Sequence, residues 1–521
     1  MRHLAWKAHG LRALALGLVC AAAPAFALNY DGTLDTSLYS ITDGIIPGLF
    51  RYGIDLGGGA PYYNYDAANA MLVQPNGKIM VAGFSWNNYL GTDQNACVLA
   101  RFNVDGAVDT GFGSGGRVVQ NFNPSSGENS CYLWSVALQG DGKIVVVGNI
   151  ADASHGERAL IERFNADGST DSSFNSSGYE VMGDHTAFAS VLVDTDGTLY
   201  AAGHYIVPNA SDNDFYLAVF DAGGNFDYTL ARAFDLGTGN DHDDRAYAQV
   251  LRFVPAQSCG VSCLIPAHSE LYLVGTANNT PYSDLANHDC AIIAYRRAVT
   301  DTQFSLDMSF NGTGAETIDF PMASNEGDNI CRAAVLRPGG GVVIGGENYF
   351  ISTLGGGTPG LASSYALAEV DAVGNVTRQD TFAFFQDLAF PGIYNGISDM
   401  VREPADGKLV VTGYAGTSVS NNAPSDVGVI RFNADFSRDS SFGNDGLGLA
   451  ILSLDGQAGQ NPAQREWGSG LALDSRGRIV LIGERSYNIS GSNPNDYDWL
   501  IARLNYFDTI FRDGLDGVVP N

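Results

Sequence analysis

Short apolar runs alternate with tight polar turns along most of the chain. The stretch from Ala70 to Gly113 shows this pattern most clearly. It contains a first turn, Gln74-Pro75-Asn76-Gly77, between two apolar runs, and a second turn, Asn103-Val104-Asp105-Gly106, after Ala-Arg-Phe. Asn-Gly and Asp-Gly between apolar runs are strong hairpin signals, because glycine accepts the positive φ that such turns require. The stretch therefore predicts two consecutive hairpins, which make four short antiparallel strands.

The same unit recurs seven times. In every unit a glycine closes the second apolar run, and these glycines are Gly83, Gly148, Gly203, Gly275, Gly346, Gly413 and Gly483. Units of about four strands that cannot bury both faces alone are typical of propeller blades, in which the neighbouring blades supply the missing core. We therefore predict an all-β fold, a seven-bladed β-propeller of four-stranded antiparallel blades.

The two ends of the propeller region predict how the ring closes. The last unit runs to Asn505 without a clear fourth strand. At the other end, Leu28 to Asp35 matches the segment that follows the third strand in other units, and apolar residues between Gly44 and Leu56 can supply the missing strand. Closing the ring in this way removes an exposed sheet edge. The propeller is predicted to span residues 28–505, with its N-terminal segment completing the last blade and residues 506–521 forming a short tail.

These motifs resemble a known family. The pattern L-x-x-D-G-K-I-x-V-x-G, followed by A-x-x-R-x-N-x-D-G-x-x-D-x-x-F-G, is similar to the bacterial delta-60 repeat, which is also described as a β-propeller domain of unknown function. The resemblance covers about residues 29 to 505 and is weakest in the units closed by Gly275 and Gly346, where the second hairpin is hard to find. It implies a propeller in secreted or surface proteins of bacteria, and it supplies no catalytic residues.

An arginine recurs at a constant distance before the second turn of the better-preserved units, at Arg101, Arg163, Arg431 and Arg503. A ligand site rarely repeats identically around a ring. We therefore predict that these arginines are struts that pair with a turn aspartate, and that the repeated Asp-Gly pairs serve turn geometry.

The first 27 residues predict export. Arg2, Lys7 and Arg12 precede an apolar run, and Ala25-Phe26-Ala27 is a small-x-small cleavage site. This is the order of a secretory signal peptide. The mature chain is thus predicted to be secreted, or to reside at the cell surface or in the periplasm of a bacterium, after cleavage near Ala27.

The cysteines that follow the leader are even in number, which favours disulfides in an exported chain. Cys97 lies at the start of a third strand and Cys131 at the start of the next unit's first strand, and Cys290 and Cys331 repeat this relation. Both starts lie on one face, so bridges Cys97–Cys131 and Cys290–Cys331 would join neighbouring blades. Cys259 and Cys263 are left to pair with each other. No CxxC…CxxC spacing indicates a zinc site.

The charge balance limits the partners. The formal net charge is −29, which repels nucleic acid phosphates and anionic lipid. No run after the leader reaches the roughly 18 apolar residues that a spanning helix needs. We expect a monomer without a nucleic acid partner or a membrane span.

Candidate binding residues lie in the loops between second and third strands. If the strands alternate in direction, these loops share one face with the connections between blades, which we call the long-loop face. They combine aromatic and acidic residues, and the candidates are Trp86, Tyr89, Asp93, Tyr205, Asp214, Asp289, Tyr414, Asp426, Tyr497 and Asp498. Aromatic rings beside Asn and Asp suit carbohydrate stacking and suit a protein interface equally well.

Two patterns raise the question of a metal. The loop-end carboxylates Asp93, Asp214, Asp289, Asp426 and Asp498 either form a ring able to hold Ca²⁺ or cap strand ends and solvate the rim. Asp241-His242-Asp243-Asp244 is the densest group of metal-ligating side chains, and it is either a site for calcium or a transition metal or an exposed acidic loop. These patterns establish no cofactor, and Ca²⁺ is the candidate that they name.

No catalytic constellation stands out, since no Gly-x-Ser-x-Gly elbow is present and the histidines share no spacing. The leading hypothesis is a binding or interaction module whose long-loop face engages a glycan, a small ligand or a surface protein. The alternatives are a propeller hydrolase or lyase with an acidic or metal site at the channel mouth, and a structural surface protein. An enzyme requires acidic or histidine residues that converge on the channel mouth, whereas a binding protein requires an aromatic patch.

Overall fold

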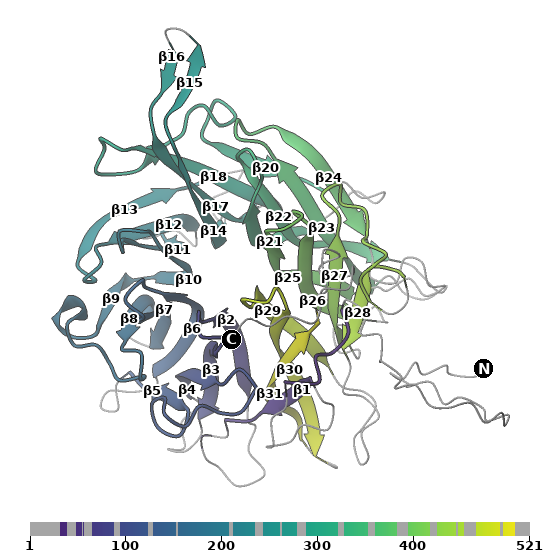
Figure 1. Ribbon diagram of the computed structural model, residues 1–521. Helices are drawn as coiled ribbons and strands as arrows, with labels where there is room; N and C mark the ends of the chain where they lie inside the picture. Colours follow the sequence, from purple (N-terminus) through teal and green to yellow (C-terminus); the bar gives the residue numbers. More distant parts are fainter. Residues whose placement is uncertain are drawn as a thin grey trace, which may run out of the picture.

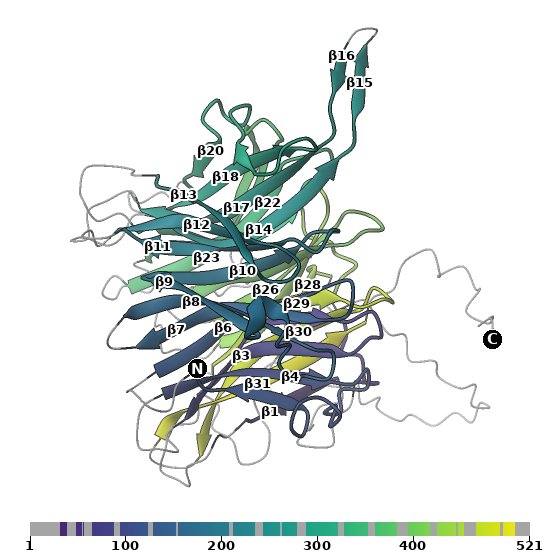
Figure 2. The same cartoon turned by 90° about the vertical axis from the view of Figure 1, so that its left-hand side faces the viewer.

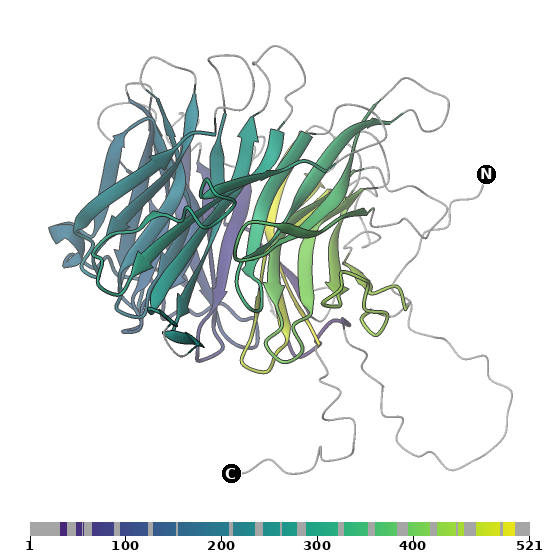
Figure 3. The ribbon, with the colours of Figure 1, turned by 90° about the horizontal axis from the view of Figure 1, so that it is seen from above.

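The computed structural model contains seven blades arranged around one axis (Figure 1). It describes residues 32–38, 48–54, 56, 65–87, 94–122, 129–152, 155–207, 212–234, 243–260, 263–278, 288–320, 328–352, 360–382, 394–416, 425–443, 446–452, 465–489 and 493–505. Each blade is an antiparallel sheet whose strands run between the two faces of a disc (Figures 2 and 3). The predicted seven-bladed all-β propeller is confirmed.

The blades are numbered in chain order, and their strands are given from the axis outward. Blades 1 to 3 consist of β2 (Asp66–Val73), β3 (Ile79–Asn87), β4 (Gln94–Phe102) and β5 (Arg117–Gln120); β6 (Asn129–Leu138), β7 (Ile144–Asp152), β8 (Gly156–Phe164) and β9 (Tyr179–Asp184); and β10 (Thr186–Val193), β11 (Leu199–Ile206), β12 (Asn213–Phe220) and β13 (Phe226–Arg232). A 3-10 turn, η1 (Phe174–Ser176), precedes β9.

The remaining blades follow the same plan. Blades 4 to 6 consist of β14 (Arg245–Val254), β17 (His268–Asn278), β18 (His288–Ala298) and an outer strand split into β19 (Ser305–Leu306) and β20 (Ala315–Ile318); β21 (Asp328–Leu336), β22 (Val342–Ser352), β23 (Gly360–Val370) and β24 (Val376–Phe382); and β25 (Tyr394–Arg402), β26 (Leu409–Gly416), β27 (Ser425–Phe432) and β28 (Leu449–Leu452). Blade 7 consists of β29 (Glu466–Leu473), β30 (Ile479–Ile489), β31 (Asn493–Leu504) and β1 (Leu49–Tyr52). A hairpin inserted in blade 4, β15 (Gln257–Gly260) with β16 (Cys263–Ile265), projects from the rim (Figures 1 and 2).

Apolar side chains fill the spaces between neighbouring blades. Val98 and Phe102 of blade 1, for example, form one buried cluster with Val480 and Trp499 of blade 7. Corresponding clusters join every other pair of neighbouring blades within the described residues. A single blade would leave both of these faces in water, so the sheets are stable only as a ring.

The seven aligned glycines mark a close approach between the two inner strands of each blade. In blade 1 the strand register shifts between Ala68 and Ala70, which is a β-bulge, and Gly83 pairs with Ala68. A Cβ atom at Gly83 would lie 1.8 Å from the carbonyl oxygen of Ala67. The same approach, between 1.7 and 2.0 Å, occurs at Gly148, Gly203, Gly275, Gly346, Gly413 and Gly483. Only glycine avoids this clash, which explains the recurrence of glycine at this place in the sequence.

The ring closes through the N-terminal segment, as predicted. Strand β1 pairs with β31, so that Leu49 lies opposite Ala502 and Tyr52 opposite Trp499. Leu34 forms an isolated bridge with Leu504. These contacts give blade 7 its outer strand, so that β31 is paired on both sides.

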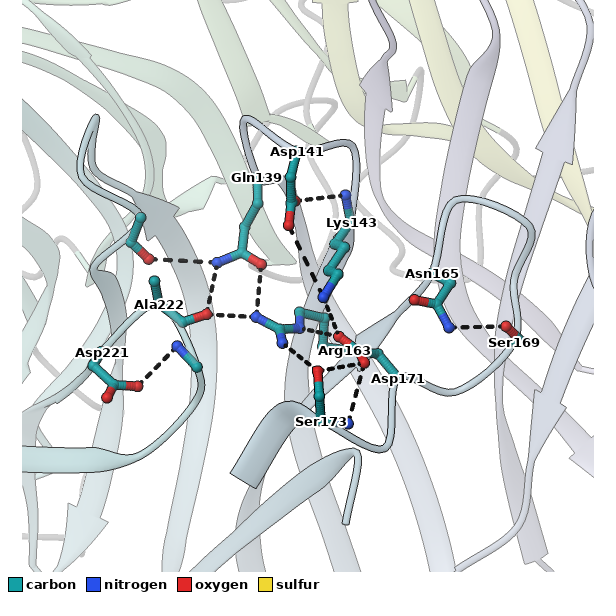
Figure 4. A network of polar contacts seen from close by, with 12 residues as sticks. Gln139, Asp141, Lys143, Arg163, Asn165, Ser169, Asp171, Ser173, Asp221 and Ala222 are labelled. Atoms are coloured by element: carbon teal, nitrogen blue, oxygen red, sulfur yellow. Dashed lines mark hydrogen bonds and ion pairs between the residues drawn. The ribbon is translucent and has the colours of Figure 1, made fainter. Parts of the chain in front are cut away.

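The predicted arginine struts are also confirmed, and they connect blades as well as turns (Figure 4). In blade 2, Arg163 Nε donates to Asp171 Oδ2 at 2.7 Å, and Nη1 donates to Gln139 Oε1 at 3.0 Å and to the Ala222 carbonyl of blade 3. The guanidinium lies 4.8 Å from the ring centre of Phe174. Equivalent pairs are Arg101 with Asp109, Arg431 with Asp439, and Arg503 with Asp35.

Blades 4 and 5, in which the second hairpin is hard to find from the sequence, have another residue in place of the strut arginine. In blade 4 the backbone N–H of Ala294 donates to Gly314 in the way that the N–H of Arg101 donates to Gly116, so a short side chain replaces the arginine. In blade 5 a carboxylate replaces it, since Glu369 pairs with Arg337 at 3.1 Å. The hairpins remain although the motif is lost.

Two disulfides join neighbouring blades as predicted, Cys97–Cys131 and Cys290–Cys331. Their presence indicates an extracellular or periplasmic protein, because such bonds persist in oxidising compartments. The side chains of Cys259 and Cys263 lie outside the described part of the structure. Across the described segments, no helix is long and apolar enough to cross a membrane.

Candidate functional site

The binding residues predicted from the sequence are spread around the ring. Those that the structure describes are Trp86 on β3, Tyr205 on β11, Asp214 on β12, Asp289 on β18, Tyr414 on β26, Asp426 on β27, and Tyr497 and Asp498 on β31. Tyr89, Asp93, Asp241 and His242 lie outside the described residues.

The described loop-end carboxylates do not converge on the axis. Each lies on the third strand of its blade, so two strands separate it from the axis. Asp498 forms an ion pair with Arg51 of the outer strand, with 3.0 Å between Oδ2 and Nη1. Asp214 lies opposite Tyr205 on the neighbouring strand. Their positions correspond to strand ends, and Ca²⁺ binding by the ring stays a prediction.

Asp243 and Asp244, the two described residues of the Asp-His-Asp-Asp segment, accept hydrogen bonds from other parts of the protein. Asp243 Oδ1 accepts hydrogen bonds from Asn213 Nδ2 and Arg245 Nε, each at 2.6 Å. Asp244 is fully buried and accepts the backbone N–H groups of Phe234 and Asn278 at 2.7 and 3.0 Å. Within the described ranges, no three His, Cys, Asp or Glu side chains are placed to hold a metal ion. A metal at this loop therefore depends on its undescribed residues and stays a prediction.

A row of six aromatic rings lies where blades 7, 1 and 2 meet. We call it the aromatic cluster, and its members in order are Trp467, Tyr497, Tyr65, Phe84, Tyr132 and Trp134. From Trp467 to Tyr132 the successive ring centres lie 5.5, 4.7, 5.6 and 4.9 Å apart. Trp134 is stacked on Tyr132 with 6.1 Å between centres and 14° between planes. These are the separations of attractive aromatic pairs.

Strand pairing places the aromatic cluster at the long-loop end of the inner strands. Tyr65 directly precedes β2 and forms an isolated parallel bridge with Tyr497. Its carbonyl accepts the backbone N–H of Trp86 at 2.9 Å. Two of the predicted aromatic residues, Trp86 and Tyr497, therefore lie at this cluster. Tyr205 instead packs on Tyr216 at 5.9 Å in blade 3.

One end of the aromatic cluster is open to solvent and is held in a fixed orientation. The side chain of Trp134 is 40% exposed, whereas Phe84 in the middle of the row is buried. Trp134 Nε1 donates to Asn149 Oδ1 at 2.7 Å, and Tyr132 Oη accepts from Asn95 Nδ2 at 2.9 Å. These hydrogen bonds hold the exposed ring in place before any ligand arrives.

A buried carboxyl group lies beside the same cluster. Tyr65 Oη donates to Glu484 Oε2 at 3.3 Å, and Glu484 is only 3% exposed. Burial raises the pKa of Glu484 to about 8, and the nearby Asp66 adds to the rise while the hydrogen bond from Tyr65 opposes it. Asp66 itself accepts hydrogen bonds from the Ile54 N–H at 2.7 Å and the Ser85 hydroxyl at 2.5 Å. Glu484 is thus uncharged at neutral pH.

The exposed Trp134 belongs to a set of residues that sequence reasoning missed. It is the extra residue of the bulge in β6, where the register shifts between Leu133 and Ser135. The extra residues of all seven inner-strand bulges are Asn69, Trp134, Ala189, Tyr247, Arg332, Ser398 and Ser469. These residues occupy equivalent positions around the axis, but their side chains differ in size and charge. Such variation is expected of positions that contact a ligand, whereas positions that stabilise the fold keep the same residue type in each blade. The aligned glycine opposite each bulge is the sequence signal by which they can be found.

Three segments of the chain match a family model described as "Domain of unknown function (DUF5122) beta-propeller", at residues 74–112, 139–174 and 405–442. This match confirms the resemblance to a propeller family of unknown function. The segments belong to blades 1, 2 and 6, which carry complete arginine struts. A comparison with curated proteins found no match.

Solved structures that resemble the chain are distant in sequence. A protein of unknown function from Dyadobacter fermentans is 11% identical, with a TM-score of 0.39 over 88% of this chain and 99% of the other. The Penicillium chrysogenum alpha-L-arabinanase is 12% identical, with a TM-score of 0.35 over 70% of this chain and 91% of the other. The propeller domain of the Trilobed protease from Pyrococcus furiosus is 8% identical, with a TM-score of 0.35 over 84% and 93%. No activity is inferred from these similarities.

Proposed function

We propose that the protein is an exported carbohydrate-binding propeller and that the aromatic cluster, with Trp134 at its exposed end, is the surface on which sugar rings stack. The aromatic cluster carries the proposal, because it is the place where the described residues combine a solvent-exposed aromatic ring with side chains that fix its orientation. Export is proposed from the leader sequence, and the two disulfides agree with it.

The chemistry of the cluster suits an uncharged sugar face. A sugar ring presents apolar C–H groups that pack on an aromatic face and hydroxyl groups at its edge that need hydrogen-bond partners. Trp134 and Tyr132 supply the face, and Asn95 and Asn149 lie at the edge of the same two rings. Glu484 adds no charge at neutral pH, so a neutral ligand meets no repulsion from it.

A glycoside hydrolase or lyase is the second candidate function, and Glu484 is the observation that favours it. A carboxyl group that stays protonated near neutral pH is suited to act as a general acid. Hydrolysis of a glycoside ordinarily uses two carboxyl groups, and the neighbouring Asp66 already accepts two hydrogen bonds from the protein. A protein partner or a purely structural role is the remaining alternative.

The test uses the full mature chain with its disulfides intact on a glycan array, followed by calorimetric titration with each glycan that binds. The Trp134→Ala variant is expected to weaken binding by about fivefold or more, because a stacked aromatic contact contributes about 1 kcal/mol or more. Phe226→Ala is the matched control, since Phe226 is 49% exposed but lies on the outer strand β13.

The proposal is overturned if no glycan binds, or if Trp134→Ala and Phe226→Ala bind equally well. The same glycans incubated with the protein and analysed for new reducing ends test the second candidate. Cleavage that is lost in Glu484→Gln but retained in Glu162→Gln, another buried glutamate, would establish the hydrolase instead.

A further inference from the structure

A second group of side chains lies at the inner strands of blades 4, 5 and 6. It consists of Tyr247 on β14, Arg332 on β21, Glu347 and Tyr349 on β22, and Tyr414 on β26. Arg332 and Tyr247 are bulge residues, equivalent in position to Trp134 of blade 2. Strands β6 and β21 lie on opposite sides of the axis (Figure 1). Arg332 and Trp134 therefore occupy corresponding places on opposite sides of the ring.

The guanidinium of Arg332 contacts an aromatic ring and a carboxylate but forms no hydrogen bond with either. It lies 5.2 Å from the ring centre of Tyr247, and its Nε is 3.6 Å from Glu347 Oε1, which is beyond hydrogen-bond length. Among the described residues, no acceptor forms a hydrogen bond with any of its N–H groups. Its side chain is 38% exposed, so water reaches it.

The structural arginines of the same protein are held differently. Arg163 makes hydrogen bonds to Asp171, Gln139 and the Ala222 carbonyl, and its side chain is only 5% exposed. Arg503 likewise donates to Asp35 at 2.8 Å and to the Val104 carbonyl at 2.6 Å. A strut satisfies its N–H donors inside the fold, whereas Arg332 keeps them available.

The same group of side chains contains two tyrosine hydroxyl groups. The hydroxyl groups of Tyr349 and Tyr414 lie 3.4 Å apart. Burial, together with the nearby Glu347, raises the pKa of Tyr414 well above its ordinary value, so its hydroxyl keeps its proton. Burial alone would lower the pKa of Arg332, but Glu347 raises it, and the guanidinium stays charged.

We propose that Arg332 is the anion-binding group of the ligand site and that the ligand is an acidic glycan whose uronic-acid carboxylate pairs with this guanidinium. The inference rests on the carbohydrate-binding function proposed above and names its ligand class. A planar guanidinium matches a planar carboxylate through two parallel hydrogen bonds. Glu347, a buried side chain whose Oε1 lies 3.6 Å from Arg332 Nε, offsets the charge of the arginine in the absence of ligand and competes with the ligand for it.

The test compares uronic-acid oligosaccharides with their methyl esters, which differ only in the negative charge. Oligomers of galacturonate, glucuronate and mannuronate are titrated into the full mature protein. We expect at least one acid to bind tenfold or more tightly than its own ester, and the preference to disappear in Arg332→Met. Arg332→Lys is expected to keep part of it, since lysine retains the charge and loses the planar pair of donors.

Glu347→Gln supplies a readout that a merely structural arginine would not give. Removing the competing carboxylate is expected to increase affinity for the acid and to leave affinity for the ester unchanged. The inference is overturned if no acid is preferred to its ester, or if the preference survives Arg332→Met. If neutral glycans still bind and Trp134→Ala still weakens them, the acidic subsite alone has failed. If nothing binds, the carbohydrate-binding function has failed with it.

Discussion

Glu484→Gln tests the electrostatics of the aromatic cluster through the pH dependence of stability. The ordinary pKa of a glutamate is 4.5, and burial raises the pKa of Glu484 to about 8 in the folded protein. Between these two values the folded protein holds a proton that the unfolded chain has released. The free energy of unfolding therefore falls as pH rises through this window, by at most about 1.4 kcal/mol for each pH unit. Over the whole window the loss amounts to at most about 5 kcal/mol.

Glutamine keeps the shape of the protonated glutamate and does not titrate. Its amide oxygen can still accept the hydrogen bond from Tyr65, which spans 3.3 Å to Glu484 in the native protein. At pH 5 the variant is expected to unfold with a free energy within about 1 kcal/mol of the native value. At pH 8.5 it is expected to be about 3 to 5 kcal/mol more stable than the native protein, because only the native protein has lost the contribution of the bound proton.

The measurement is urea denaturation at several pH values from 5 to 8.5, followed by tryptophan fluorescence with the disulfides kept oxidised. Two variants serve as controls. Burial also raises the pKa of Glu162 to about 8, so Glu162→Gln, on β8 of blade 2, should show the same sign. Burial alone would raise the pKa of Asp171, but hydrogen bonds from Lys143 and Ser173 and the charge of Arg163 hold it well below its usual range. Asp171 is therefore ionised in the folded and in the unfolded protein from pH 5 to 8.5, and the stability lost in Asp171→Asn should be the same across that range.

The reasoning fails if the stability difference between Glu484→Gln and the native protein is independent of pH, or if it grows toward the acid end. Either result would mean that Glu484 is ionised in the folded protein at neutral pH. A charged Glu484 would also weaken the case for a neutral sugar-binding surface beside Tyr65.

Three further predictions concern the scaffold. Arg163→Met should lower the free energy of unfolding by about 1 to 3 kcal/mol, because the Gln139 side chain and the Ala222 carbonyl lose a donor and Asp171 keeps only Lys143 as a cationic partner. The same change at the exposed Arg476 should cost less than about 0.5 kcal/mol in urea denaturation. Gly148→Ala should destabilise the protein by about 1 to 3 kcal/mol, since its Cβ would lie 1.8 Å from the Tyr132 carbonyl oxygen. Gly140→Ala is the control and should leave the melting temperature nearly unchanged, because no heavy atom lies within 4 Å of its Cβ position. Equal effects of the two substitutions would refute the close approach as the reason for the recurring position of the glycine. Replacing both Cys97 and Cys131 by serine opens a loop closed across 34 residues and should cost about 2 to 4 kcal/mol, which thermal unfolding with and without reductant would measure.

The scaffold could be predicted from the sequence because each of its features is local and repeated. The aligned glycines identify the blades, because the backbones of the two inner strands come equally close together in every unit. The contact at Gly83 explains why each unit needs a glycine at this position. The struts follow from the arginine that recurs at a constant distance before the second turn, as Arg163 does. The disulfides follow from the positions of four cysteines in neighbouring units.

The candidate site could be predicted only in part, because its residues come from distant parts of the chain. Trp86 and Tyr497 were selected for their aromatic character, and ring closure brings both to Tyr65. Nothing in the local sequence of Tyr65 indicates that it would meet Tyr497. The loop-end carboxylates such as Asp498 have a clear pattern, but their third-strand position keeps them away from the axis.

The sequence by itself determined the repeat, the number of blades, the closing segment and the two disulfides, because hairpin turns and close backbone approaches depend on residues a few positions apart. Only the tertiary structure decided which side chains face one another across blades. The bulges that present Trp134 and Arg332, the burial that keeps Glu484 protonated, and the donors that Arg332 leaves available depend on the packing of neighbouring blades. A single unit therefore contains the information for its own strands and turns, and the candidate site exists only when the ring is closed.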